Sequence, residues 1–317
     1  MAPHGEGSEE AMVVQDENRK PISSILIVIA MQTEAMPIVN KFQLKEDLDS
    51  VLIRQRMMMI QVSKRGALGQ ISWRLQRSPY QLSMAWKGSK SGLLCTEFLK
   101  TINFHLHQIH TFQDTQYQFL YSPVQDMDMG YAFYLGVDSV GTISASLVTY
   151  AAIQALQPDL IINAGTAGSF KVKGASISDV FLASDVAFHD RRIPIPVFDL
   201  YGVGSRQSFS TPNLLKELNL KAGKLSTGDS LDMSPQEEAS IVANDATVKD
   251  MEGAAVAYVA DLLKVPAIFI KAVTDIVDGD KPTAEEFLQN LAAVTAALEQ
   301  AVTQVVDFIN GKCLSEL

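Results

Sequence analysis

One stretch, VPAIFIKAVTDIVDGD at residues 265–280, constrains the fold of this chain most strongly. Its apolar, β-branched run lies between Pro266 and an acidic turn that contains glycine, which is typical of a parallel strand buried on both faces. The strand ends at Thr274 and Asp275. Ligands of open α/β sheets bind beyond the carboxyl ends of the strands, so Asp275 stands where a functional side chain is expected. A role as the cap of a following helix is the alternative, and position alone slightly favours it.

Three other predicted strands also end in residues that can contact a ligand. Residues 22–31 (ISSILIVIAM) precede Glu34, residues 159–164 (DLIINA) precede GTAGSF with Thr166, and residues 224–233 (KLSTGDSLDM) include Asp229. We expect GTAGSF to form a glycine turn whose backbone amides can approach a ligand. For Glu34, complementation of the dipole of the following helix is the alternative role.

Helical spacing of apolar residues separates these strands. It predicts helices after residue 31, within 136–156, over 212–220, 237–246 and 254–263, and from Pro282 to near Gly311. Met251 and Glu252 directly precede the helix at 254–263, where a carboxylate again complements the dipole. Another strand is predicted at residues 179–186, so strands and helices alternate, which is typical of an α/β domain.

Composition excludes several classes of protein. The chain has 317 residues, 47% of them apolar, so it can bury a sizeable core, and its net charge of −10 argues against binding nucleic acid or anionic lipid. No run approaches the roughly 18 apolar residues of a membrane helix. Two cysteines indicate a reducing compartment. We therefore expect a cytoplasmic protein with a disordered acidic tail over residues 1–20 and a single domain over 21–317.

Residues 52–134 differ from the rest of the chain. Up to Tyr134, basic residues outnumber acidic ones, and the apolar residues follow neither a strand nor a helix period. His105, His107 and His110 invite a metal site, but no cysteine or acidic residue lies at a supporting spacing, so we expect no metal. The segment is interpreted as an atypical insert or a divergent segment.

The order of the motifs resembles one family. IVIAMQTEA, GVDSVGT, PDLIINAGTAG, SDVAFHDRRIPIP, STGDSLDM, KDMEGAAVAYVA and KAVTDIVDGDKPTAEEFLQN together resemble the 5′-methylthioadenosine/S-adenosylhomocysteine nucleosidases, with wording most similar to the plant methylthioadenosine nucleosidases. The resemblance covers about residues 21–50 and 135–317. It implies a nucleoside phosphorylase-like three-layer α/β fold with a central mixed sheet flanked by helices.

The resemblance also implies an activity and a set of site residues. The activity is hydrolysis of the N-glycosidic bond of 5′-methylthioadenosine to adenine and the thioribose, in methionine salvage, with S-adenosylhomocysteine as a second candidate substrate. Glu34 matches the general base that activates water, and Asp275 matches the acid that protonates N7 of adenine. No metal or organic cofactor is implied. The matched substrate-binding positions are Thr166, Leu231, Asp232, Lys249, Asp250, Met251 and Glu252.

Alternatives remain within and outside this activity. Purine nucleoside phosphorylases of related fold hold phosphate with arginines after the first strand, whereas here the equivalent turn contains Glu34 and no arginine. Plant storage proteins share the fold without known catalysis. The family is typically homodimeric, and HDRRIPIP is a candidate contact. The family also has a much shorter segment in place of residues 52–134, with central strands that the sequence analysis does not find here, so we hypothesise a divergent transcript or gene model.

Overall fold

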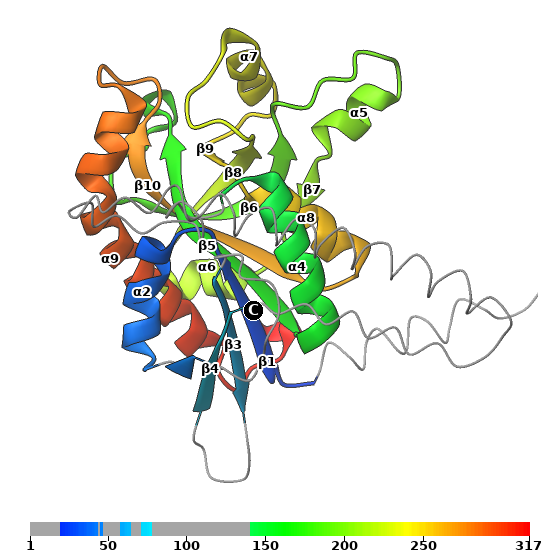
Figure 1. Cartoon of the computed structure of the whole chain (residues 1–317), viewed down its shortest axis with the longest axis vertical. Helices are drawn as coiled ribbons and strands as arrows, with labels where there is room; N and C mark the ends of the chain where they lie inside the picture. Colours follow the sequence, from blue (N-terminus) through cyan, green and yellow to red (C-terminus); the bar gives the residue numbers. More distant parts are fainter. Residues whose placement is uncertain (1–19, 44, 47–57, 65–70, 78–139) are drawn as a thin grey trace, which may run out of the picture. The chain divides into compact units, whose positions relative to one another are not determined.

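The computed structural model describes residues 20–43, 45–46, 58–64, 71–77 and 140–317 (Figure 1). These residues belong to one compact unit, formed by Met1–Tyr80 and Gly130–Leu317. A second unit, Gln81–Met129, lies outside the described residues, as do residues 1–19 of the acidic tail predicted over 1–20 and the three histidines of HLHQIH.

A mixed β-sheet forms the centre of the unit. Parallel pairs join β1 to β5 and β5 to β10, whereas β1 with β3 and β10 with β6 are antiparallel. The strands are β1 (Ser24–Ile29), β2 (Lys45–Glu46), β3 (Met58–Lys64), β4 (Ile71–Arg77), β5 (Leu160–Ser169), β6 (Val180–Phe188), β7 (Arg206–Gln207), β8 (Lys221–Thr227), β9 (Val248–Asp250) and β10 (Ala267–Ile276).

The long strand β5 is the junction of this sheet. It pairs with β1, with β10 and, at Gly168 and Ser169, with β9. Strand β10 pairs with β6, β6 pairs with β8, β8 pairs with β9, and β9 pairs with β5. Together with the β5–β10 pair, these five strands form a closed ring. The ring brings the carboxyl ends of β5 and β10 close to β9, although these segments are far apart in sequence.

Helices cover both faces of the sheet (Figure 1). One face packs against α4 (Thr142–Leu156) and α8 (Gly253–Leu262), and the other packs against α2 (Gln32–Lys41), α6 (Pro212–Leu218) and α9 (Thr283–Ile309). The remaining helices are α5 (Phe198–Val203), α7 (Pro235–Ala243) and the short 3₁₀ turns η1 (Lys171–Lys173) and η2 (Leu314–Glu316). The predicted three-layer arrangement is confirmed.

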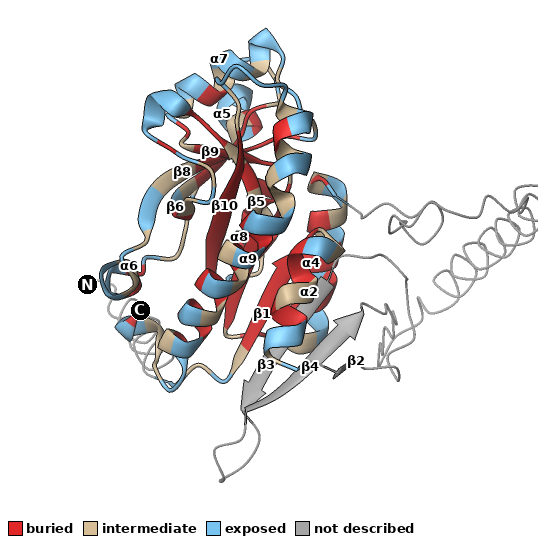
Figure 2. Ribbon diagram, turned by 90° about the vertical axis from the view of Figure 1, so that its left-hand side faces the viewer, coloured by how far each residue is buried: buried red, intermediate tan, exposed pale blue. Residues whose placement is uncertain are grey.

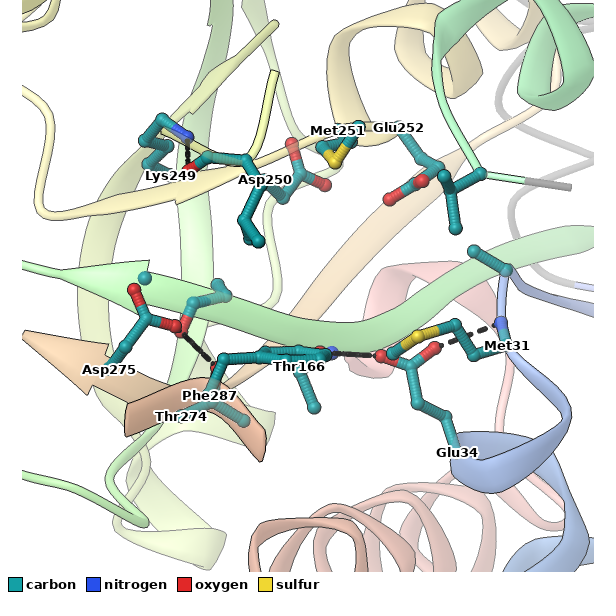
Figure 3. Close-up of a pocket in the computed structure, with 15 residues that line it drawn as sticks. Met31, Glu34, Thr166, Lys249, Asp250, Met251, Glu252, Thr274, Asp275 and Phe287 are labelled. Atoms are coloured by element: carbon teal, nitrogen blue, oxygen red, sulfur yellow. Dashed lines mark hydrogen bonds between the residues drawn. The ribbon is translucent and has the colours of Figure 1, made fainter. Parts of the chain in front are cut away.

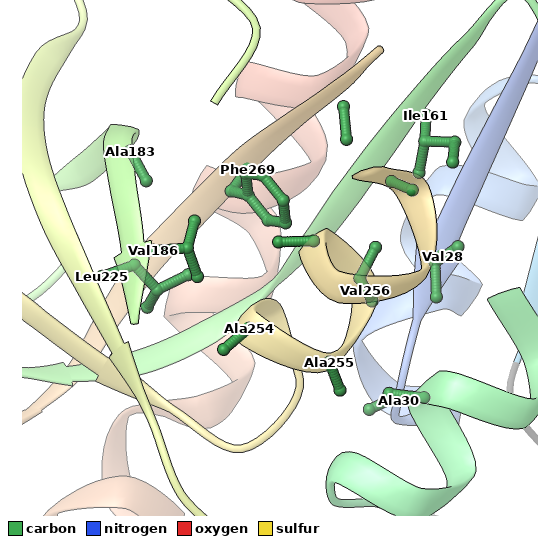
Figure 4. Packing of buried hydrophobic residues seen from close by; sticks show 14 of the residues in the cluster. Val28, Ala30, Ile161, Ala183, Val186, Leu225, Ala254, Ala255, Val256 and Phe269 are labelled. Atoms are coloured by element: carbon green, nitrogen blue, oxygen red, sulfur yellow. The ribbon is translucent and has the colours of Figure 1, made fainter. Parts of the chain in front are cut away.

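Strand β1 shows why the sequence adopts this arrangement. Ile25, Ile27 and Ile29 enter the cluster shared with α2 and α9, while Leu26 and Val28 enter the cluster shared with α4 and α8. Successive side chains of a strand point to opposite faces, so a strand covered on both sides must be apolar throughout. Figure 2 shows the central strands buried, with exposed residues on the outer sides of α2 and α9, and Figure 4 shows α8 packed on Val28 and Phe269.

The segment at residues 52–134 requires a correction. No strand was predicted there from the sequence, but β3 and β4 lie within it, and β3 pairs antiparallel with β1 along all six residues of β1. Strand pairing is a long-range interaction that a missing local period does not exclude. The rest of the segment, together with the hypothesis of a divergent gene model, lies outside the described residues.

Within the described part of the chain, no helix is both long enough and apolar enough to cross a bilayer.

Candidate active site

A cavity of about 280 Å³ opens where β1, β5 and β10 end. This position follows the general rule for α/β sheets and confirms that the strand ends are brought together. Eight of the nine residues predicted for the site line it (Figure 3): Glu34, Thr166, Leu231, Lys249, Asp250, Met251, Glu252 and Asp275. The ninth, Asp232, is exposed and is absent from the lining.

Glu34 lies in the first turn of α2 and is 2% exposed. One carboxylate oxygen accepts hydrogen bonds from the backbone N and the Oγ1 of Thr166, both at 2.7 Å, and the other accepts from the N of Met31 at 3.2 Å. The bond to Met31, the N-cap residue, holds the carboxylate at the amino-terminal end of α2, where it complements the helix dipole, so Glu34 has this alternative role and also lines the cavity. Burial raises the pKa of Glu34, while the Thr166 hydrogen bonds oppose that rise.

The glycine-rich segment that carries Thr166 is not a turn. Residues 165–169 continue strand β5 and pair with β10, because the ring of strands provides partners on both sides. The small residues are still required. A Cβ on Gly168 would lie 2.7 Å from Oδ2 of Asp275, and one on Gly165 would lie 3.4 Å from Oε1 of Glu34. The glycines therefore let two carboxyl groups approach the strand.

Asp275 lies near the end of β10 and is 2% exposed. Its Oδ1 accepts a hydrogen bond from Oγ1 of Thr274 at 2.8 Å. Burial raises the pKa of Asp275, and nearby Glu286 adds to the rise, whereas the Thr274 hydroxyl and Lys249 oppose it. A carboxyl group in this environment retains its proton to a higher pH than an exposed aspartate.

Glu252 is another buried carboxyl group of the cavity lining and directly precedes α8. Its Oε1 accepts the backbone N–H of Gly141 at 2.8 Å. Figure 3 shows Glu252 and Glu34 toward one end of the cavity and Asp275 toward the other. Burial, followed by the negative charge of Asp250, raises the pKa of Glu252 from 4.5 to about 7.

Glu252 is expected to lower the stability of the fold at alkaline pH. Because its folded pKa lies above its unfolded value, its stabilising contribution is complete below pH 4.5 and is lost as the pH rises through 7. Glu252→Gln cannot ionise, so we expect it to exceed the wild type at pH 8 by up to about 3 kcal/mol and to match it near pH 4.5. Thermal unfolding at both pH values measures this, with Glu217→Gln on the surface as control. A lower midpoint for Glu252→Gln at pH 8 would contradict the burial argument.

One residue of the cavity lining forms a buried ion pair that was not predicted from the sequence. The ammonium of Lys271, 1% exposed, lies 2.8 Å from Oδ2 of Asp250. Asp250 also accepts from Oγ1 of Thr227 at 2.5 Å and from the N of Gly253 at 2.8 Å. The Asp250 carboxylate is thus bound by protein groups, and the positive charge of Lys271 opposes the rise in pKa of Glu34 and Glu252.

The loop after β8 forms another wall. The ammonium of Lys249 donates to the carbonyl oxygens of Ser230 and Leu231, each at 2.8 Å, and burial lowers its pKa. Lys249 therefore fixes the backbone that presents Leu231 to the cavity.

Ser169, at the end of β5, does not line the cavity. It is fully buried, and its hydroxyl donates to the carbonyl oxygen of Thr247 at 2.6 Å.

Among the described residues, no cluster of three or more histidine, cysteine, aspartate or glutamate side chains is arranged to hold a metal ion.

Comparison with known proteins agrees with this architecture. A sequence profile described as "Phosphorylase superfamily" matches residues 125–307. A methylthioadenosine/S-adenosylhomocysteine nucleosidase of Helicobacter pylori superposes with a TM-score of 0.59 at 17% identity, covering 91% of this chain and all of that one, and so supports the fold. Fold and profile together define the class as an α/β domain of the phosphorylase superfamily.

Two relatives from Arabidopsis thaliana are much more similar. A 5′-methylthioadenosine nucleosidase is 56% identical over 321 aligned residues that cover 100% of both chains, and a 5′-methylthioadenosine/S-adenosylhomocysteine nucleosidase is 52% identical over 96% of this chain and 99% of the relative. The apo structure of an Arabidopsis 5′-methylthioadenosine nucleosidase superposes with a TM-score of 0.71 at 55% identity, covering 94% of this chain and all of that one. The chain belongs to the 5′-methylthioadenosine/S-adenosylhomocysteine nucleosidase family.

Proposed function

We propose that this protein hydrolyses the N-glycosidic bond of 5′-methylthioadenosine, releasing adenine and the thioribose, and that it acts in methionine salvage. The observation that carries the proposal is the convergence of Glu34, Glu252 and Asp275, all buried, on one cavity. The 56% identity to a 5′-methylthioadenosine nucleosidase along the whole chain supports the choice of substrate.

Asp275 acts as the general acid in this proposal. An N-glycosidic bond breaks through a state resembling an oxocarbenium ion, and the departing adenine needs a proton at N7. Asp275 must hold that proton near neutral pH. The rise in its pKa caused by burial supports this role.

Glu34 acts as the general base and activates water for attack at C1′ of the ribose. The base must be ionised, and the Thr166 N–H and hydroxyl, with the charge of Lys271, favour the ionised carboxylate against burial. Its location toward the opposite end of the cavity from Asp275 (Figure 3) suits attack on the side of the ribose opposite the base.

Glu252 holds the ribose. Gly141 occupies Oε1, and the carboxylate retains capacity to accept hydrogen bonds from the ribose hydroxyls. Met251 packs against the sugar, Leu231 borders the purine, and Thr166 orients Glu34. Asp250 binds the ammonium of Lys271, and Lys249 binds the carbonyl oxygens of Ser230 and Leu231. Both residues therefore hold the walls of the cavity in place.

Water, and not phosphate, is the proposed nucleophile. Among the described residues that line the cavity, Lys249 is the one cation, and its ammonium is bound to two carbonyl oxygens, so no free positive charge in the lining is available to hold a phosphate dianion.

Phosphate dependence tests the choice of nucleophile. We expect adenine release from 5′-methylthioadenosine at the same rate in phosphate-free buffer and in phosphate. A requirement for phosphate, with a sugar phosphate as product, would identify a phosphorylase. No adenine in either buffer would favour the catalytically silent, storage-type alternative. The same assay with S-adenosylhomocysteine determines whether it is a second substrate.

A homodimer is proposed on the exposed apolar side chains of two segments. On α4, Ile143 and Tyr150 are 75% and 50% exposed, and in the stretch around α5, Val197 and Leu200 are 78% and 74% exposed. Apolar patches of this kind mark interaction surfaces. Light scattering measures the mass of the protein in solution. We expect twice the mass of one chain, and the mass of a single chain would contradict the homodimer. A cytoplasmic location is proposed from the low cysteine content.

A further inference from the structure

The first turn of α4 is bound by carboxylates from two distant segments. Its N-cap residue is Gly141, which has no side chain, and the first turn contains no acidic residue. The backbone N–H groups of a first turn have no partner within the helix and favour negative charge. Glu252 accepts from the N of Gly141, and Asp229, which follows β8, accepts from the N of Thr142.

Asp229 binds Thr142 with both carboxylate oxygens. Oδ1 accepts the backbone N–H and Oδ2 accepts the hydroxyl, each at 2.6 Å. Asp229 is itself held at its backbone, because its N donates to Oδ2 of Asp190 at 2.7 Å. A two-point contact from a tethered side chain fixes the orientation as well as the position of the helix start.

Gly141 transmits this contact to Glu252. Its φ of +99° lies in a region that favours glycine, and a Cβ there would lie 2.7 Å from Oδ1 of Asp229. Because Gly141 has no side chain, the Asp229 carboxylate can lie against it. The N–H of Gly141 itself donates to Oε1 of Glu252 at 2.8 Å. Loss of Asp229 would release the backbone that orients Glu252.

We propose that Asp229 is a positioning residue for the ribose-binding Glu252, acting through the Gly141–Thr142 backbone. The inference rests on the proposed function for its substrate, and it adds a residue to which the sequence resemblance assigned no role. Asp229 also belongs to the loop that presents Leu231, but the backbone at Leu231 is held separately by the ammonium of Lys249.

Enzyme kinetics on the full chain tests the proposal, with matched variants. Asp229→Ala removes both contacts, and Asp229→Asn keeps an oxygen for the N–H of Thr142. Asp159→Ala is the control, because Asp159 is another aspartate that accepts from a hydroxyl and two backbone N–H groups, of Ser23 and Ser24, away from the cavity. Each variant is assayed with 5′-methylthioadenosine and with its 2′,3′-dideoxy analogue.

We expect Asp229→Ala to lower kcat/KM for 5′-methylthioadenosine about 10-fold, mainly through KM, because one fixed hydrogen-bonding group is lost from binding. Asp229→Asn is expected to recover part of this loss, and Asp159→Ala to match the wild type. The loss should nearly vanish on the dideoxy analogue, which offers Glu252 no hydroxyl. Wild-type values for Asp229→Ala, or an equal loss on both substrates, would overturn the proposal.

Amide hydrogen exchange separates this inference from the proposed function. If the wild type releases no adenine, the proposed hydrolysis fails, but exchange at Gly141 can still be measured by NMR. We expect the Gly141 amide to exchange about 10-fold faster in Asp229→Ala than in the wild type or in Asp159→Ala. Unchanged protection of Gly141 would show that Asp229 does not support its bond to Glu252.

Discussion

Asp275→Asn is expected to lower kcat for adenine release by about 10²–10⁴, the range typical of a lost general acid. Asparagine has nearly the same shape and can still accept from the Thr274 hydroxyl, but it has no acidic proton to give to N7. Because burial disfavours the charged form of Asp275, the neutral replacement should not weaken the fold. Adenine formation measured alongside thermal unfolding separates the two effects.

Asp280→Asn provides the matched control. Asp280 lies five positions further along the same segment, is exposed and is absent from the cavity lining. We expect it to retain wild-type activity. A fully active Asp275→Asn protein would remove Asp275 from the role of acid, whatever the control shows.

Glu34→Gln is expected to cause a loss of similar size, about 10²–10⁴ in kcat, because glutamine cannot take a proton from water. Its side-chain oxygen can still accept from Thr166, but its NH₂ group faces the N–H of Met31, which loses its acceptor. A modest loss of stability is therefore expected as well, of about 1 kcal/mol.

The pH profile identifies the role of Glu34 more specifically than the rate does. In the wild type, kcat should fall on the acid side as Glu34 gains its proton, at a pH above the usual range of a glutamate because burial raises its pKa. In Glu34→Gln the residual rate should lack that limb. Glu217→Gln on the exposed surface of α6 is the control. An unchanged acid limb in Glu34→Gln would assign the base to another group.

The sequence predicted elements whose signals are local. The apolar run of β10, the amphipathic face of α9 and the boundaries near Pro282 and Gly311 are set by neighbouring residues, and the structure agrees with them. Strands β3 and β4 were missed because their place in the sheet depends on pairing: β3 pairs with β1 and β4 pairs with β3, and no short window contains all three strands.

The sequence indicated cavity residues at the ends of strands, but it did not indicate the residues and pairings that hold them in place. GTAGSF was expected to be a turn, since glycine favours turns locally, but pairing with β10 and β9 keeps it extended. Lys271 left a signal that went unused, because a lysine within a buried apolar strand requires a charged partner, here Asp250. Asp232, predicted to border the purine together with Leu231, is exposed and absent from the cavity lining.

A crystal structure with a non-hydrolysable analogue of 5′-methylthioadenosine tests the central claim most directly. The account predicts N7 of the purine within hydrogen-bonding distance of Asp275, the ribose hydroxyls on Glu252, and Glu34 facing C1′ across a water molecule. Analogue bound away from these three carboxyl groups, or bound in the cavity with the purine turned from Asp275, would contradict it.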